Sequence, residues 1–104
     1  MAVAEFTLAV TAAKIKPLAA EWSHAGVVSS GDLEVLIKPD PGSGRAVFHV
    51  RTEAAGFDAV WRQVLERLTQ RLELGDVQVY INDNAATPPV VARRVEQAVQ
   101  EGRE

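Results

Sequence analysis

Two serines, a histidine and an aspartate lie close together in the first third of the chain. His24, Ser29, Ser30 and Asp32 are the residue types from which a serine hydrolase builds its base, nucleophile and orienting carboxylate. The G-x-S-x-G pattern of a nucleophile elbow is absent. Closeness along the chain does not place side chains in a triad, so a hydrophilic turn explains these residues with fewer assumptions.

Paired carboxylates are a second candidate, because two such groups can act as general acid and base. Asp32 and Glu34 would share one face of a strand, opposite Leu33. Alternation of this kind is typical of the solvated face of a half-buried strand. Asp83 with a neighbour is another such candidate, and we expect His49 to be an ordinary surface histidine.

The chain has no cysteine and only two histidines. This excludes disulfides, thiolate-bound metals and a cysteine nucleophile. A structural zinc site needs about four ligands, usually Cys or His, so we expect no metal site. Gly42-Ser43-Gly44 matches neither the Walker pattern nor the dinucleotide fingerprint, and a flexible loop is the simpler interpretation.

Composition is that of an ordinary globular protein, with 104 residues, 47% hydrophobic residues and a net charge of −3. The length predicts a single domain over residues 1–104. Without a Lys/Arg cluster or an apolar run of about 20 residues, we expect neither a nucleic-acid nor a membrane partner. Met1–Val10 makes a poor secretory signal, so we expect a cytoplasmic protein.

The order of elements can be predicted from hydrophobic periodicity. Residues 1–25 form a poorly defined segment, with an edge strand at Phe6–Val10 and a short helical turn at Leu18–Trp22. Residues 33–38 and 45–52 both alternate. Because a Pro/Gly-rich loop separates them, they are interpreted as a β-hairpin.

Helical periodicity follows in the second half. An apolar stripe that includes Trp61 predicts a helix over Phe57–Leu74, with Gly75 as its C′ residue. Residues 77–81 predict a strand, which the turn-forming residues 82–84 should end.

Thr87-Pro88 is typical of a helix start, with the threonine as N-cap and the proline at N1. On this C-terminal helix we expect Arg93-Arg94 on a solvated or partner-binding face, and residues 102–104 to fray. The whole predicts an α+β two-layer sandwich, in which two helices cover one face of a small, mostly antiparallel sheet.

The segment Val27–Leu33 stands just before a strong strand and contains Ser29, Ser30, Gly31 and Asp32. A turn held by side-chain-to-backbone hydrogen bonds is one interpretation. The other is that an exposed serine offers its hydroxyl to a modifying enzyme. Gly31 would then let a large phosphate-bearing group approach the backbone, and no base within the chain would be needed.

At this point the sequence resembles a known family. Gly26–Leu36 (GVVSSGDLEVL) looks like the modification segment of the acyl carrier (delta) subunit of biotin-independent malonate decarboxylase. Ile81–Val91 (INDNAATPPVV) is similar to its second hallmark, and the resemblance covers about residues 26–101. The acyl carrier subunit of citrate lyase is the nearest alternative within the class.

The resemblance implies a carrier rather than an enzyme. Ser30 would be joined through a phosphodiester to 2′-(5″-phosphoribosyl)-3′-dephospho-coenzyme A, whose thiol carries acetyl and malonyl groups. Gly31 would give the linkage room, and Asp32 would orient the loop or be read by the modifying enzyme. A chain without cysteine can carry a thioester only on an attached thiol. The implied partners are the acyltransferase (alpha) subunit, the decarboxylase beta and gamma subunits and the prosthetic-group transferase.

Some residues depart from the family pattern. Ser29 stands where the family has glycine, so it is a second candidate hydroxyl beside Ser30. Asn84-Ala85 replaces a bulky residue followed by glycine, and Pro89 replaces a second glycine. The alternative function is an unmodified α+β interaction or regulatory subunit.

Overall fold

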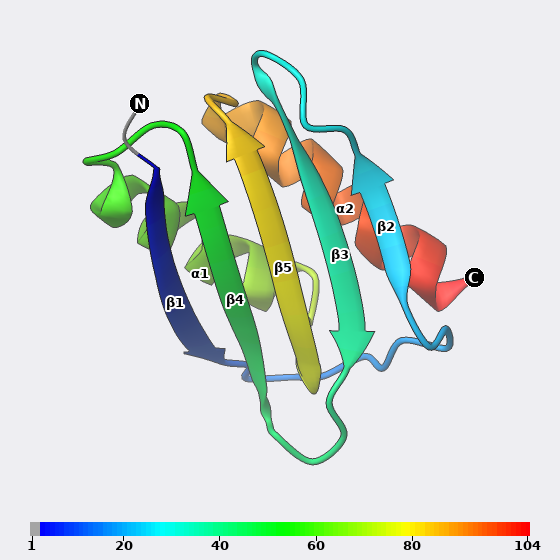
Figure 1. The fold of residues 1–104 in the computed structure, drawn as a ribbon. Helices are drawn as coiled ribbons and strands as arrows, with labels where there is room; N and C mark the ends of the chain where they lie inside the picture. Colours follow the sequence, from blue (N-terminus) through cyan, green and yellow to red (C-terminus); the bar gives the residue numbers. More distant parts are fainter. Residues whose placement is uncertain (1–2) are drawn as a thin grey trace.

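A sheet of five strands, with two helices on one of its faces, makes up the computed structural model, which describes residues 3–104 (Figure 1). The elements are β1 (Ala4–Thr11), β2 (Ser23–Gly26), β3 (Asp32–Pro39), β4 (Arg45–Thr52), α1 (Asp58–Arg71), β5 (Val77–Asn84) and α2 (Pro88–Arg103). The α+β fold with a mostly antiparallel sheet, predicted from the sequence, is confirmed.

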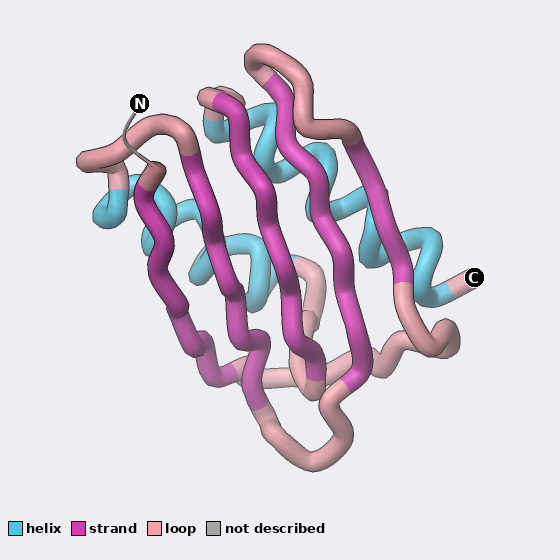
Figure 2. The backbone as a smooth tube through the Cα atoms, in the orientation of Figure 1, coloured by secondary structure: helices cyan, strands magenta, loops and turns pink. Residues whose placement is uncertain are grey.

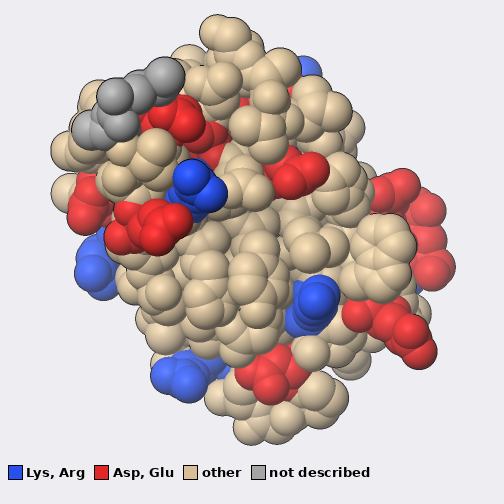
Figure 3. Space-filling view, viewed as in Figure 1, with Lys and Arg blue, Asp and Glu red and all other residues tan. Residues whose placement is uncertain are grey.

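The strands lie in the order β1-β4-β5-β3-β2. Only β4 and β5 are parallel, and α1 is the crossover between them, as a parallel pair requires. All other neighbours are antiparallel. Figure 2 shows both helices behind the same face, which leaves the other face uncovered. In Figure 3, uncharged side chains fill much of the centre of that uncovered face.

The predicted hairpin between residues 33–38 and 45–52 is wrong. β3 and β4 are strands, but β5 lies between them and pairs with both, so that Val79 is opposite Ile37 on one side and Phe48 on the other. The central position buries the apolar side of β5 completely, including Val79 and Ile81. Alternation reveals that a segment is a strand, but not which strand is its neighbour.

The end of α1 also differs from the expectation. The helix ends at Arg71, and Glu73 with φ +51° takes the left-handed C′ position predicted for Gly75. The amide of Leu74 donates to the carbonyl of Thr69 at 2.9 Å, the 6→1 bond of a Schellman motif. Gly75 serves close packing instead, because a Cβ there would lie 2.5 Å from Ile15 Cγ1.

The N-terminal segment contributes β1, at one edge of the sheet as predicted, and the start of β2. The helical turn expected at Leu18–Trp22 is absent. Instead, the amides of Ala19 and Ala20 donate to the carbonyl of Gly102 at 2.8 and 3.0 Å. The expected fraying is therefore wrong for Gly102 and Arg103, since Gly102 is buried and α2 continues to Arg103.

At the other end of α2, Thr87 is the N-cap and Pro88 opens the helix, as predicted, although the threonine side chain makes no capping hydrogen bond. The turn expected at residues 82–84 is wrong, because β5 continues through them. Neither helix of the described residues is long and apolar enough to cross a membrane.

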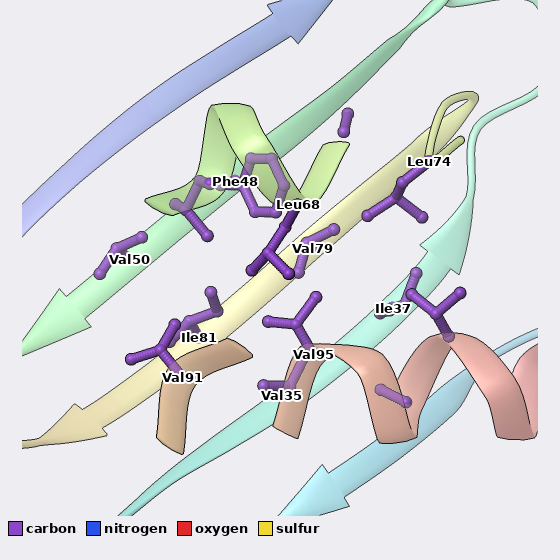
Figure 4. Packing of buried hydrophobic residues seen from close by; sticks show 14 of the residues in the cluster. Val35, Ile37, Phe48, Val50, Leu68, Leu74, Val79, Ile81, Val91 and Val95 are labelled. Atoms are coloured by element: carbon purple, nitrogen blue, oxygen red, sulfur yellow. The ribbon is translucent and has the colours of Figure 1, made fainter. Parts of the chain in front are cut away.

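The core lies between the sheet and the helices (Figure 4). Alternate residues of the strands point toward the apolar stripes of α1 and α2. Trp61 of α1 belongs to this core, as predicted from the sequence. The fully enclosed side chains of the core include Leu33, Val35, Ile37, Phe48, Leu65, Leu74, Val79 and Val95.

Candidate attachment site

The segment singled out in the sequence forms the loop between β2 and β3. The amide of Asp32 donates to the carbonyl of Ser29 at 2.9 Å, which closes a four-residue turn. Gly31, the third residue of that turn, has φ +76°, as position i+2 of a type II turn requires. Ser30 is therefore the first corner residue, where the chain turns outward.

Solvent surrounds this turn. Ser29, Ser30 and Gly31 are all exposed, as are Val27 (59%) and Val28 (53%) before them. No heavy atom outside its chain neighbours lies within 4 Å of the position a Cβ would take at Gly31. The hydroxyl of Ser30 thus has an open path outward, and the backbone beside it is free of neighbouring side chains.

The base of the loop is held firmly. The amide of Gly31 donates to the carbonyl of Asn84 at 2.8 Å, and Asp32 pairs with Asn84 in the ladder between β3 and β5. At the β2 side, Gly26 has φ +82°, and a Cβ there would collide with the carbonyl oxygen of Leu33. The two sequence motifs, far apart along the chain, therefore meet at one end of the sheet.

An ion pair joins the loop to α2. Arg94 donates from Nε to Asp32 Oδ1 at 3.0 Å and from Nη2 to Oδ2 at 2.8 Å, a bidentate arrangement. The Arg94 hydrogen bond, helped by one from the Leu33 amide, lowers the pKa of Asp32. The solvated or partner-binding role predicted for Arg94 overlooked this contact, and no local signal could have revealed a partner 62 residues away.

Asp32 and Glu34 do not act as a carboxylate pair. Glu34 lies 3.0 Å from His24 Nε2, and this hydrogen bond is the main cause of its lowered pKa. The structure gives Asp32 a different partner, Arg94. The two carboxylates have separate hydrogen-bond partners that favour their charged forms, which does not favour proton transfer between them.

The remaining candidates have structural roles. His24 points to Glu34 rather than to a serine, and His49 Nε2 donates to Gln78 Oε1 at 2.7 Å on the uncovered face. Asp83, at 4% exposure, accepts a hydrogen bond from Thr52 Oγ1 at 2.7 Å. Within residues 3–104, no group of three His, Cys, Asp or Glu side chains could hold a metal ion.

Comparison with known proteins places the chain in a family. Residues 21–102 match the family model described as the malonate decarboxylase delta subunit. The malonate decarboxylase acyl carrier protein of Malonomonas rubra is 49% identical over 80 residues, 77% of this chain and 71% of the relative. That of Xanthomonas euvesicatoria pv. vesicatoria (strain 85-10) is 45% identical over 80 residues, 77% of this chain and 76% of the relative.

A solved structure agrees with these relatives. A chain of a Pseudomonas malonate decarboxylase hetero-tetramer in complex with malonate is similar with a TM-score of 0.75 and 31% identity, over 97% of this chain and 98% of that one. Its coverage includes β1, which lies before the residues matched by the family model. The chain belongs to the malonate decarboxylase delta subunit family.

Proposed function

We propose that this chain is the acyl carrier subunit of a malonate decarboxylase, and that Ser30 anchors 2′-(5″-phosphoribosyl)-3′-dephospho-coenzyme A. The observation that carries the proposal is the exposed Ser30 at the corner of a turn whose base is fixed to β5 and α2. Family membership and the names of the relatives support the carrier role.

The loop fits a large attached group. Space around Gly31 is open, and the exposed side chains of Val27 and Val28 precede the turn in the chain. When bound, the group would supply the thiol that carries the acyl thioester, which a chain without cysteine cannot provide. A rigid base with an exposed tip presents one hydroxyl to a modifying enzyme in a reproducible position.

Each neighbour of Ser30 has a distinct role in this proposal. Gly31 permits the positive φ of the turn and leaves room for the phosphodiester. Asp32 orients the loop through Arg94, so its carboxylate is a positioning group. Ser29 is the first residue of the turn, and its backbone carbonyl accepts the hydrogen bond that closes the turn. Ser30, the next residue, lies at the corner. This favours Ser30 over Ser29 as the anchor.

We further propose that the carrier works within a complex. The Pseudomonas relative was solved in a hetero-tetramer. The partners we propose for this chain are an acyltransferase (alpha) subunit, decarboxylase beta and gamma subunits, and the transferase that attaches the group. A carrier serves more than one active site, so at least one contact should be small and reversible, below roughly 1,200 Å².

Intact-protein mass tests the anchor. The chain is co-expressed with the family's modification enzymes, and the wild type should gain the mass of the group. Ser30→Ala should gain none, whereas Ser29→Ala, which removes the adjacent hydroxyl, should still be loaded. An unmodified wild type that still assembles with its partners would support an interaction subunit instead. Full loading of Ser30→Ala would refute the assignment of Ser30.

A further inference from the structure

An apolar pocket of about 300 Å³ opens between the N-terminal ends of α1 and α2. Its walls include Trp61 and Val64 of α1 and Val91 of α2, with Ala54 and Ala86 from the neighbouring loops. Phe57 (53% exposed) and Val60 (42% exposed) also line it, and both are unusually open for large apolar side chains. The volume suits a small ligand group.

The pocket lies at the same end of the sheet as the attachment loop. The β2–β3 loop, the β4–α1 loop and the β5–α2 connection all gather there (Figure 1). Asn84 holds Gly31 through its carbonyl, and the preceding residue, Asp83, lines the pocket. Neighbouring strands are about 4.8 Å apart. An arm on Ser30 therefore needs to cross only one or two strand spacings and pass over the ends of the strands.

The lining of the pocket would treat neutral and charged acyl groups differently. Asp83 is the one charged residue in the lining, and its two oxygens already accept from Thr52 Oγ1 and the Ala86 amide. A free thiol or an acetyl thioester brings no charge into this apolar space. A malonyl group brings a second carboxylate beside Asp83, without any lining cation to compensate for repulsion and lost hydration.

We infer that this pocket holds the distal thiol or acetyl end of the group attached at Ser30 and excludes the malonyl form. The inference rests on the proposed function. A sheltered acetyl thioester would be protected from water, whereas the malonyl thioester would stay outside the pocket, where an active site can reach it. The pocket thus distinguishes the resting form of the carrier from the form that is ready for decarboxylation.

Trp61 reports directly on occupancy. The chain has two tryptophans, and Trp22 is 61% exposed, so Trp22→Phe leaves Trp61 as the single indole without disturbing the core. A sulfur atom makes a favourable contact with an aromatic ring. A thiol or thioester in the pocket would therefore change the surroundings of the Trp61 indole. Loading confirmed by mass should change Trp61 emission in the thiol and acetyl forms, while the malonyl form should match the unloaded protein.

A second measurement uses the thiol itself. The thiol should react about fourfold faster with a neutral aromatic disulfide in Val60→Glu than in the wild type. Fourfold is the factor expected when the bound end of the arm loses the burial of about one methylene group. Val3→Glu is the matched control, because Val3 is similarly exposed (40%) and does not line the pocket. It should react at the wild-type rate.

The outcomes separate the two proposals. A wild type that gains no mass overturns the proposed function and this inference together. A loaded protein whose Trp61 emission does not change, and whose thiol reacts equally fast in Val60→Glu and wild type, overturns the pocket assignment alone. Equal emission changes for acetyl and malonyl forms would refute the discrimination between them.

Discussion

Ala85 occupies a backbone conformation that suits glycine. Its φ is +59°, in the connection between β5 and α2. An L residue with a Cβ pays roughly 1–2 kcal/mol in this left-handed region. The Asp83 carboxylate holds the connection by accepting a hydrogen bond from the Ala86 amide at 3.1 Å. The chain therefore keeps this turn although the positive φ is unfavourable for Ala85.

Ala85→Gly should therefore raise the free energy of unfolding by about 0.5–1 kcal/mol, after allowing for the greater backbone freedom of glycine in the unfolded chain. Urea unfolding measures this change. Ala86→Gly is the matched control, because residue 86 is not among those with positive φ, and it should lower stability instead. A destabilised Ala85→Gly would show that the strain is not relieved at this position.

The Asp32–Arg94 pair makes stability depend on pH. The pKa of Asp32 is lowered in the folded protein, mainly by the hydrogen bond from Arg94 and secondly by the one from the Leu33 amide. A group with a depressed pKa stabilises the fold above its ordinary pKa, and this contribution is lost as the pH falls through the lower, folded value. Arg94→Gln should consequently destabilise the protein near neutral pH, by an amount that shrinks below about pH 4.

Urea unfolding at several pH values follows this difference. Arg93→Gln is the control on the same helix, since Arg93 is exposed and makes no contribution to this pair, and it should stay close to wild type at each pH. A difference between Arg94→Gln and wild type that is constant from neutral to acid pH would argue against the pair as its cause.

At the scale of elements, the β2–β3 hairpin depends on two glycines for different reasons. Gly26 needs both a positive φ and the absence of a side chain, because its Cβ would meet the Leu33 carbonyl. Gly31 needs only the positive φ, since its surroundings are open. The first glycine builds the hairpin, and the second shapes its tip.

Substitution by alanine should separate these roles. Gly31→Ala should cost about 1 kcal/mol of backbone strain and leave the fold intact. Gly26→Ala should cost distinctly more, because a steric clash adds roughly 1–3 kcal/mol. Thermal unfolding compares the two, and hydrogen exchange in β2 locates the damage. Equal losses would mean that the clash at Gly26 is relieved by a small shift of the backbone.

The elements themselves could largely be predicted from the sequence, whereas their neighbours could not. The alternation over residues 77–81 identifies a strand, yet the insertion of β5 between β3 and β4 depends on the α1 crossover and on burial of Val79 from both sides. The end of α1 differs from the expectation for a similar reason. Glu73 adopts the αL conformation while Gly75 yields space to Ile15, a long-range contact that periodicity does not contain.

The same limit applies to the site. The local pattern at Ser29–Asp32 was enough to predict an exposed turn, because glycine and short polar residues determine turns locally. Arg94 and the pocket beside Trp61 come from α1, α2 and the ends of two strands. Only folding brings them to the loop, so one sheet end gathers every group that the two proposals require.

At the scale of the whole molecule, the question is whether the segment matched by the family model is stable without β1. The family model begins at residue 21, but β1 covers the outer side of β4 and buries Leu8 and Val10 at 5% and 7% exposure. Phe6 also meets Trp61 edge to face at 6.3 Å. Removing residues 1–12 should therefore cost roughly 3–6 kcal/mol from the two buried side chains alone.

Such a loss is comparable with the whole stability of a domain, about 5–15 kcal/mol. The shortened chain should unfold at a much lower urea concentration and show faster hydrogen exchange along β4, which becomes an unprotected edge. Leu8→Ala in the full chain is the control for lost packing with the β1–β4 ladder kept, and it should cost about 2–5 kcal/mol. If the shortened chain unfolds at the wild-type midpoint, β1 is an accessory strand and residues 13–104 carry the stability of the carrier without it.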